Sequence, residues 1–176
     1  GGGPAPVTYI LTGHEWSYLD KGSDQGRAWR SADFDDSGWA SGPSELGYGS
    51  DGEGAGTRVS FGPNPSGKYA TTYFRTSVDI PNPSVFFKFL LRIKFDDGVA
   101  VYINGKEVLR QNLASGASFE SFASGSVGAE EEWKEFTLPT SALSAGTNAI
   151  AVEIHQASGS SSDIRLDMML RGETIQ

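Results

Sequence analysis

The chain has 176 residues, with 14 Lys and Arg against 22 Asp and Glu and a formal net charge of -8 at pH 7. This length fits one domain, and the acidity disfavours nucleic acid and anionic membranes as partners because both attract clustered Lys and Arg. With no Cys and only two His, disulfide scaffolds, zinc fingers, iron–sulfur clusters and cysteine nucleophiles are excluded.

The chain opens on Gly-Gly-Gly-Pro-Ala-Pro, which lacks the charged and apolar pattern of a signal peptide. We interpret residues 1–6 as a linker or a cloning remnant, 7–172 as one β-sandwich domain and 173–176 as a tail. No stretch of the sequence approaches the roughly 20 apolar residues of a membrane helix.

Glycine is concentrated at the start, where 15 of the 23 Gly precede residue 68. Gly, Asp and Ser favour turns, so this part predicts loops. The loops are expected to be ordered, because a disordered segment would lack aromatic residues. Aromatic residues occur throughout this part, among them Trp16, Tyr18, Trp29, Phe34, Trp39 and Tyr48.

From Tyr69 onward the hydrophobic pattern has a period of two residues. Apolar side chains alternate with polar ones over Val85–Asp96, which predicts a long half-buried strand. The alternation continues through Val99–Ile103. Asn104-Gly105 is the strongest short signal for a hairpin turn, so Lys106–Leu109 is predicted to be the returning strand.

The last third of the chain supplies three more predicted strands. These are Trp133–Leu138, Ala149–His155 and Ile164–Arg171. A helical turn is expected within Pro139–Gly146. About eight strands joined by irregular loops predict an all-β fold, a two-sheet antiparallel β-sandwich of the jelly-roll kind.

Three segments together resemble a known family. Phe34–Trp39, with the sequence FDDSGW, resembles a segment near the start of the sugar-binding jelly-roll domain of family 2 glycoside hydrolases. Asp96–Val108 resembles the hairpin of those domains, and Asn148–Gln156 resembles their penultimate strand. The order and spacing match over residues 9 to 171, so the resemblance implies a galactose-binding-like β-sandwich. It also implies an accessory domain, with carbohydrate as its commonest ligand class.

Catalysis is not expected. The adjacent acids Asp35-Asp36 and Asp96-Asp97 would point to opposite faces of a strand, whereas a glycosidase needs two acids facing each other. No Gly-x-Ser-x-Gly or phosphate-binding loop occurs. An amino-terminal copper site has no ligand, because Gly rather than His is the first residue.

Sugar binding needs aromatic surface and a few polar groups. Tyr48, between glycines and followed by Asp51, is predicted to be an exposed platform, whereas Trp16, Trp29 and Trp39 are expected to pack on the sheet. His155 and Gln156 adjoin a loop, and Arg92 and Tyr102 are expected to share the strand face of His155. The alternative is a solvated sheet surface with cross-strand charge pairs. The predicted ligand-binding residues are Tyr48, Asp51, Arg92, Tyr102, His155 and Gln156.

Calcium is the second expected ligand, because it takes six to eight oxygens from carboxylates and loop carbonyls. Asp20 and Asp24 lie in a Gly-rich loop, and Asp163 and Asp167 lie near the carboxyl end. The hypothesis is one structural Ca²⁺ that joins the amino-terminal loop to the final strand. Capping of loop amides by these four Asp residues is an equal alternative.

The expected function is that of a noncatalytic carbohydrate-binding module, monomeric and secreted or displayed on a bacterial surface. It would hold an attached catalytic domain near polysaccharide and so raise the effective concentration of substrate. The alternative is a structural or adhesion module that binds no sugar. Neither nucleic acid nor membrane is an expected partner.

Overall fold

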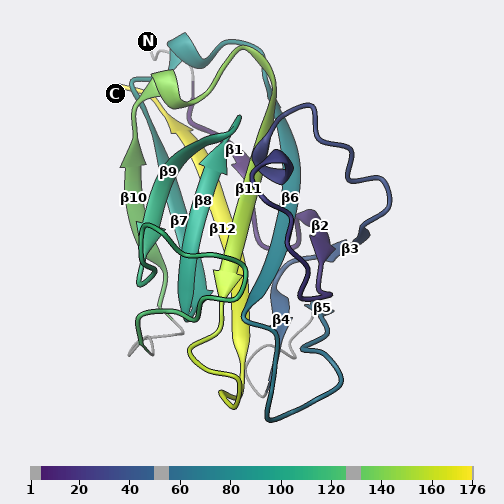
Figure 1. Cartoon of the computed structure of the whole chain (residues 1–176). Coiled ribbons are helices and arrows are strands. Elements are labelled where there is room, and N and C mark those ends of the chain that lie inside the picture. Colours follow the sequence, from purple (N-terminus) through teal and green to yellow (C-terminus); the bar gives the residue numbers. More distant parts are fainter. Residues whose placement is uncertain (1–4, 50–55, 126–131, 176) are drawn as a thin grey trace.

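Two β-sheets pack face to face in the computed structural model (Figure 1), which describes residues 5–49, 56–125 and 132–175. The expected all-β sandwich is confirmed. In the part of the chain described, the only helices are three short 3₁₀ turns, η1 (Ala28–Arg30), η2 (Pro83–Val85) and η3 (Thr140–Ala142). The last of these confirms the turn expected after Pro139.

The first sheet has the strand order β10-β7-β12-β4-β5, with β1 also paired to β12. All of its pairs are antiparallel except β4 with β5. The strands are β1 (Val7–Ile10), β4 (Leu46–Tyr48), β5 (Thr57–Arg58), β7 (Lys88–Asp96), β10 (Lys134–Leu138) and β12 (Ile164–Glu173).

The second sheet is antiparallel throughout, with the order β3-β2-β6-β11-β8-β9. Its strands are β2 (Glu15–Leu19), β3 (Ala40–Pro43), β6 (Thr71–Ile80), β8 (Gly98–Ile103), β9 (Lys106–Gln111) and β11 (Gly146–His155). The turn between β8 and β9 is the predicted Asn104-Gly105, and both residues have positive φ, 50° and 86°.

The core lies between the sheets and follows the predicted alternation. On β11, for example, Ile150, Val152 and Ile154 are fully buried in it. The prediction for β7 is correct from Lys88 onward but wrong before it. Val85 belongs to η2, and Phe86 rather than Phe87 turns inward, because the 3₁₀ turn changes the phase of the alternation.

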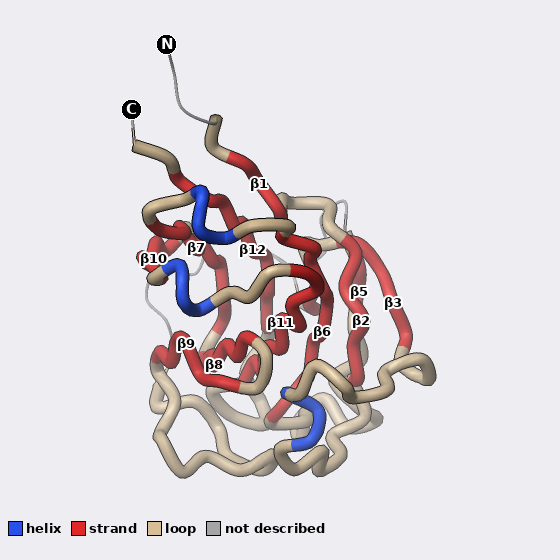
Figure 2. The backbone as a smooth tube through the Cα atoms, turned by 90° about the horizontal axis from the view of Figure 1, so that it is seen from above, coloured by secondary structure: helices blue, strands red, loops and turns tan. Residues whose placement is uncertain are grey.

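A second apolar cluster lies on the outer face of the second sheet, away from the first. It consists of Trp29, Tyr73, Ala100, Tyr102, Leu113 and Ala151, with Leu19, Phe34, Trp39, Ala117 and Phe119 packed against it. Two loop regions cover this outer cluster, residues 20–39 and 112–125. Figure 2 shows loops and a helical turn beyond β6, β8 and β11, on the side opposite β7 and β12. The expected packing of Trp16, Trp29 and Trp39 is confirmed.

The glycines on either side of Tyr48 have a structural cause. A Cβ atom at Gly47 would collide with the carbonyl oxygen of Ile164, and one at Gly49 would collide with Asp163. Glycine is therefore required where β4 passes close to the start of β12.

Candidate functional site

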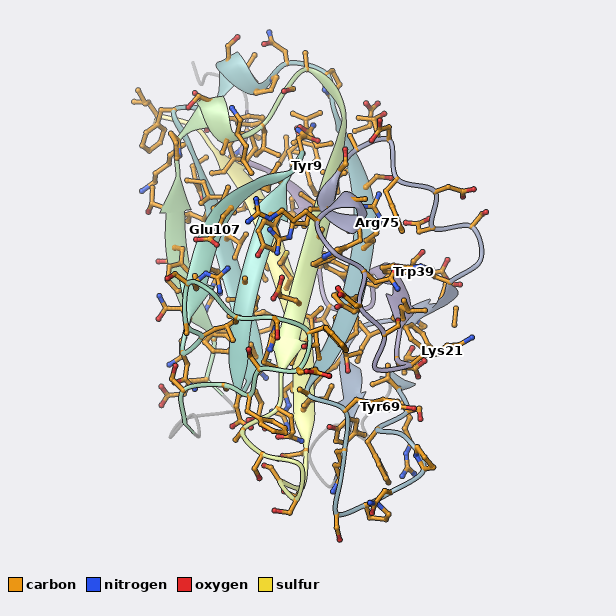
Figure 3. All side chains as sticks on the ribbon, in the orientation of Figure 1. Tyr9, Lys21, Trp39, Tyr69, Arg75 and Glu107 are labelled. Atoms are coloured by element: carbon orange, nitrogen blue, oxygen red, sulfur yellow. The ribbon has the colours of Figure 1, made fainter. Side chains whose placement is uncertain are left out.

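An open groove of about 550 Å³ lies on the outer face of the second sheet, over β8 and β11. Glu107 on β9 and Arg75 on β6 lie to either side of this region in Figure 3. The loops around η1 and residues 115–119 form its walls. Six of the lining residues are charged, Asp24, Arg27, Arg30, Glu107, Arg110 and Glu153.

Tyr102 forms the floor of the groove together with Trp29. Their ring centroids are 5.8 Å apart in an edge-on arrangement, and the guanidinium carbon of Arg30 lies 4.1 Å from the centroid of the Tyr102 ring. The Tyr102 hydroxyl donates to Oε2 of Glu153 at 3.0 Å and accepts from Nη2 of Arg110 at 3.2 Å. Burial, reinforced by the charge of Glu153, raises the pKa of Tyr102, so its hydroxyl remains protonated.

Glu153 and His155 form a buried pair at the edge of this floor. Nε2 of His155 lies 2.7 Å from Oε1 of Glu153, and both side chains are almost completely buried. Burial raises the pKa of Glu153. The hydrogen bond and charge of His155, together with the charge of Arg30, outweigh that effect and leave this pKa below its ordinary value. Glu153 is therefore a carboxylate.

His155 also contacts the loop that lines the groove. Its Nδ1 lies 2.6 Å from the carbonyl oxygen of Ser121, which can only accept, so Nδ1 is the donor of this hydrogen bond. The imidazole of His155 thus lies between Ser121 and Glu153.

The same network holds one wall of the groove in place. His155 donates to Ser121, Thr71 Oγ1 donates to the carbonyl of Phe119 at 2.8 Å, and Nη1 of Arg110 donates to that of Ala114 at 2.8 Å. The loop that lines the groove is thus attached to β6, β9 and β11, and the site is formed before any ligand arrives.

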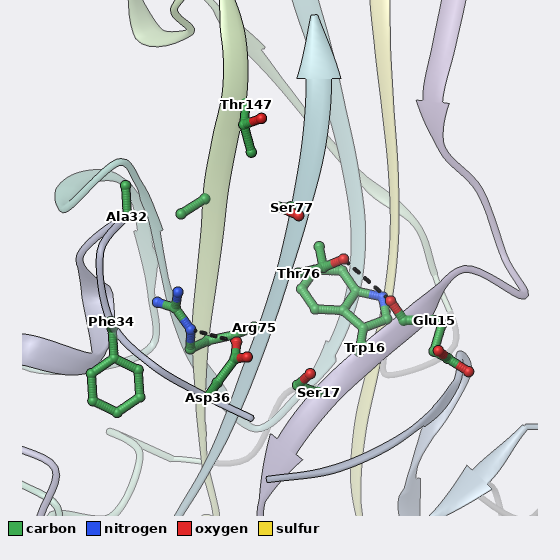
Figure 4. A pocket seen from close by; sticks show the side chains of 11 residues that line it. Glu15, Trp16, Ser17, Ala32, Phe34, Asp36, Arg75, Thr76, Ser77 and Thr147 are labelled. Atoms are coloured by element: carbon green, nitrogen blue, oxygen red, sulfur yellow. Dashed lines mark hydrogen bonds and ion pairs between the residues drawn. The ribbon is translucent and has the colours of Figure 1, made fainter. Parts of the chain in front are cut away.

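A smaller trough of about 390 Å³ lies beside η1 on the same outer face (Figure 4). Nε of Arg75 donates to Oδ2 of Asp36 at 2.9 Å, and Nη1 donates to the carbonyls of Trp29 and Ser31. Ser17, Ser77 and Thr147 supply hydroxyls elsewhere in its lining. Arg75 thus holds the η1 loop against the sheet, and it is 5% exposed.

The predicted exposed platform at Tyr48 is wrong. Tyr48 is 1% exposed, its ring packs edge-on against Phe61 at 5.4 Å, and its hydroxyl accepts from Nε2 of Gln156 at 2.9 Å. Gln156 is buried too. The neighbouring glycines permit close strand packing rather than exposure, so this pair faces the interior of the sandwich.

The other predicted ligand-binding residues are distributed over the molecule. Tyr102 shares the strand face of Glu153 and His155, as expected. Arg92 does not, because it lies on β7 in the other sheet, 3.9 Å from Glu135. Asp51 lies outside the described residues. The alternative, a solvated sheet surface, is wrong at His155, which is fully buried and contacts the carbonyl of Ser121 in the covering loop.

The four Asp residues proposed for calcium accept hydrogen bonds at separate places. Asp20 accepts from the amide of Ser60 at 2.6 Å, and Asp24 accepts from that of Gly26 at 2.9 Å. Asp167 accepts from Thr12 Oγ1 at 2.7 Å. Asp163 directly precedes β12 and accepts from Ser162 Oγ at 3.1 Å. Among the described residues no three His, Asp or Glu side chains form a group that could hold a metal ion.

Sequence reasoning missed Arg27, Arg30 and Arg110 as groove residues. A signal for Arg110 existed, because the Asn104-Gly105 turn fixes the hairpin register that pairs Arg110 with Ala100. Arg27 and Arg30 lie in a segment without periodicity, so nothing in the sequence placed them at the groove.

Comparisons with solved structures agree with the fold. A β-glucuronidase 2 from Bacteroides uniformis matches 95% of this chain with a TM-score of 0.58 and 18% identity. A Ruminococcus gnavus β-glucuronidase matches 96% with a TM-score of 0.58 and 11% identity. A β-glucuronidase from glycoside hydrolase family 2 matches 85% with a TM-score of 0.52 and 16% identity.

In each case this chain covers a small part of the enzyme, 18%, 30% and 14% of the three chains respectively. Its fold thus corresponds to one domain of those proteins. No protein-family model matches the sequence, and no curated protein does. None of the helices in the described part of the chain has the length and apolar character needed to cross a membrane.

Proposed function

We propose that the protein is a noncatalytic carbohydrate-binding domain whose ligand occupies the groove. The observation that carries the proposal is the array on the Tyr102 floor, where the guanidinium of Arg30 lies over the ring and Glu153 lies beside it. Sugar hydroxyls both donate and accept hydrogen bonds, and such an array offers a guanidinium donor next to carboxylate acceptors.

The groove favours polar recognition over stacking. The rings of Trp29 and Tyr102 are 1% and 2% exposed, so they support Arg30 rather than present a face to a sugar ring. The open side is lined by short side chains, Ser115, Ala117 and Ser118, which leave room for a pyranose.

The similar structures support the attachment of such a domain to a glycosidase. They are β-glucuronidases of which this fold occupies a minor part. We propose that the domain belongs to a secreted or surface-displayed bacterial hydrolase. By holding polysaccharide near the catalytic partner, it would raise the effective substrate concentration.

A glycan array together with retention on insoluble polysaccharides tests the proposal. The wild type is expected to retain a defined set of glycans. Ser115→Trp, which puts a large ring at the wall of the groove, is expected to abolish retention. The matched control is Ser77→Trp, an exposed serine in the trough, which should bind as the wild type does. Retention of no glycan by the wild type, or full retention by Ser115→Trp, would contradict the proposal.

One observation favours the alternative of a structural module. Exposed apolar side chains gather near the carboxyl end of β12, where Val7 pairs opposite Gly172 and the amide of Phe87 donates to the carbonyl of Glu173. Val85 and Ile175 extend this exposed set. Such a set is suited to packing against another domain. A domain that retains no glycan on the array would leave this packing role as the better supported function.

A further inference from the structure

We propose that the groove takes a sugar that carries a carboxylate, and that Arg30 and Arg27 bind that carboxylate. The inference rests on the proposed function, because it names the chemical class of ligand for the same site. The net charge of -8 alone would favour neutral or cationic glycans, because an acidic protein as a whole repels an acidic glycan. The proposed carboxylate ligand therefore depends on the local charges of the groove.

The three arginines of the groove differ in how many of their N–H groups already donate to acceptors of the protein. Arg110 is occupied, since Nε donates to Glu107 at 2.9 Å, Nη1 to Ala114 and Nη2 to Tyr102. Arg30 has one polar contact, a loose one of 3.5 Å from Nη2 to Oε2 of Glu153, so its Nη1 has no hydrogen-bond partner in the part of the chain described. Arg27 is exposed and makes no ion pair with a described residue. Two cations at the groove therefore retain donors for a ligand.

The carboxylates at the groove are already largely compensated. Glu107 lies 2.7 Å from Nη2 of Arg110, and Glu153 lies 2.7 Å from Nε2 of His155 and 3.5 Å from Nη2 of Arg30. Asp24, Glu107 and Glu153 are the three acidic residues of the lining, and Arg27, Arg30 and Arg110 are its three basic ones. The formal charges of the lining thus balance, although the chain as a whole is acidic.

The geometry favours a carboxylate on a sugar over a more highly charged group. The guanidinium of Arg30, which lies over the Tyr102 ring, is planar and presents its N–H bonds in one plane, which matches a planar carboxylate. A sugar carboxylate brings one negative charge to this balanced lining, whereas a phosphate dianion brings about two beside Asp24 and Glu107. The volume of about 550 Å³ also exceeds the needs of a bare anion, and the remaining lining suits hydroxyls.

Titration calorimetry with a matched pair of probes tests this assignment. The probes are trigalacturonate and its full methyl ester, which share a sugar backbone, the ester carrying a neutral methyl carboxylate in place of each charged carboxylate. The wild type is expected to bind the acid about tenfold more tightly than the ester, and this preference should fall at high salt. Arg30→Gln is expected to lose most of the preference, because its affinity for the acid should fall much more than its affinity for the ester.

Two further variants keep the test decisive. Arg27 is exposed, so Arg27→Gln leaves the fold intact and is expected to reduce the preference about threefold. Lys88→Gln removes a cation from β7 in the other sheet and is expected to preserve the whole preference.

The outcomes separate this inference from the proposed function. Equal binding of acid and ester, or a preference that survives Arg30→Gln, would overturn the carboxylate assignment and leave carbohydrate binding in place. Displacement of the trisaccharide by acetate at a similar concentration would show recognition of a bare anion and would overturn it too. Binding of neither probe, together with an array that retains only neutral glycans, would also overturn the assignment but not the function. An empty array would reject both.

Discussion

The hydroxyl of Tyr48 accepts a hydrogen bond of 2.9 Å from Nε2 of Gln156, a residue 108 positions later in the chain. Tyr48 ends β4 in the first sheet, and Gln156 follows β11 in the second. Both are buried, so this bond joins the two layers of the sandwich where water is excluded.

Tyr48→Phe is expected to lower the free energy of unfolding by about 1–2 kcal/mol, because it removes one partner of a buried hydrogen bond while keeping the ring. Urea denaturation measures the change. Tyr69→Phe is the control, since Tyr69 is only partly buried and no hydrogen bond is found for its hydroxyl among the described residues. Equal midpoints for Tyr48→Phe and the wild type would show that this bond contributes nothing.

Alkaline pH is expected to destabilise the fold through its buried tyrosines. Burial raises the pKa of Tyr48 and that of Tyr73 from 10.0 to about 12. The unfolded chain ionises above pH 10 while the folded chain keeps its protons. Stability is therefore complete below pH 10 and falls as pH rises toward 12. Unfolding free energies measured across this range should decline less steeply for Tyr48→Phe. An identical decline would contradict the assignment to Tyr48.

Acid is expected to weaken the fold through Glu153. Its pKa is held below the ordinary value of 4.5, so its contribution is present above pH 4.5 and is lost as pH falls below that value. Thermal unfolding of the wild type and of Glu153→Gln at pH 7 and at pH 3 tests this. The variant should lose less stability than the wild type between the two pH values, because its amide does not titrate. Parallel losses would exclude Glu153 as a source of acid sensitivity.

Two glycine substitutions should separate backbone strain from close packing. Gly105→Ala places a methyl in open space at a φ of 86° and is expected to cost about 1–2 kcal/mol. Gly47→Ala forces a methyl against the backbone of Ile164 and is expected to cost about 3 kcal/mol or more. Urea denaturation of both variants gives the comparison. A smaller loss for Gly47→Ala would mean that β4 and β12 separate easily.

The sandwich was predictable from the sequence because period-two patterns report burial directly. The alternation on β11 and on β12 correctly identified their inward faces. The error at Tyr48 has a physical origin, because glycine serves both flexible turns and close strand contacts. The sequence pattern does not distinguish these uses, and only the position of Ile164 against Gly47 does.

The groove was less predictable, because it depends on segments without periodicity. Alternation places Glu153 and His155 on the outer face but cannot show that residues 20–39 and 112–125 cover them. Arg92 was assigned to that face for a related reason. Periodicity gives the face of a strand, whereas the sheet to which the strand belongs depends on long-range pairing, here of β7 with β10 and β12.

Strand β12 pairs with β1, β4 and β7, so it is the common neighbour of segments that leave the ribosome much earlier. Val7 is translated about 165 residues before its partner Gly172, which corresponds to a delay of roughly ten to thirty seconds at ordinary rates of synthesis. Strand β7 is made later than β1 but still before β12, so its apolar face lacks its central partner until β12 is translated. The first sheet is therefore expected to assemble only once the last strand is available, and folding dominated by such distant pairings is slow.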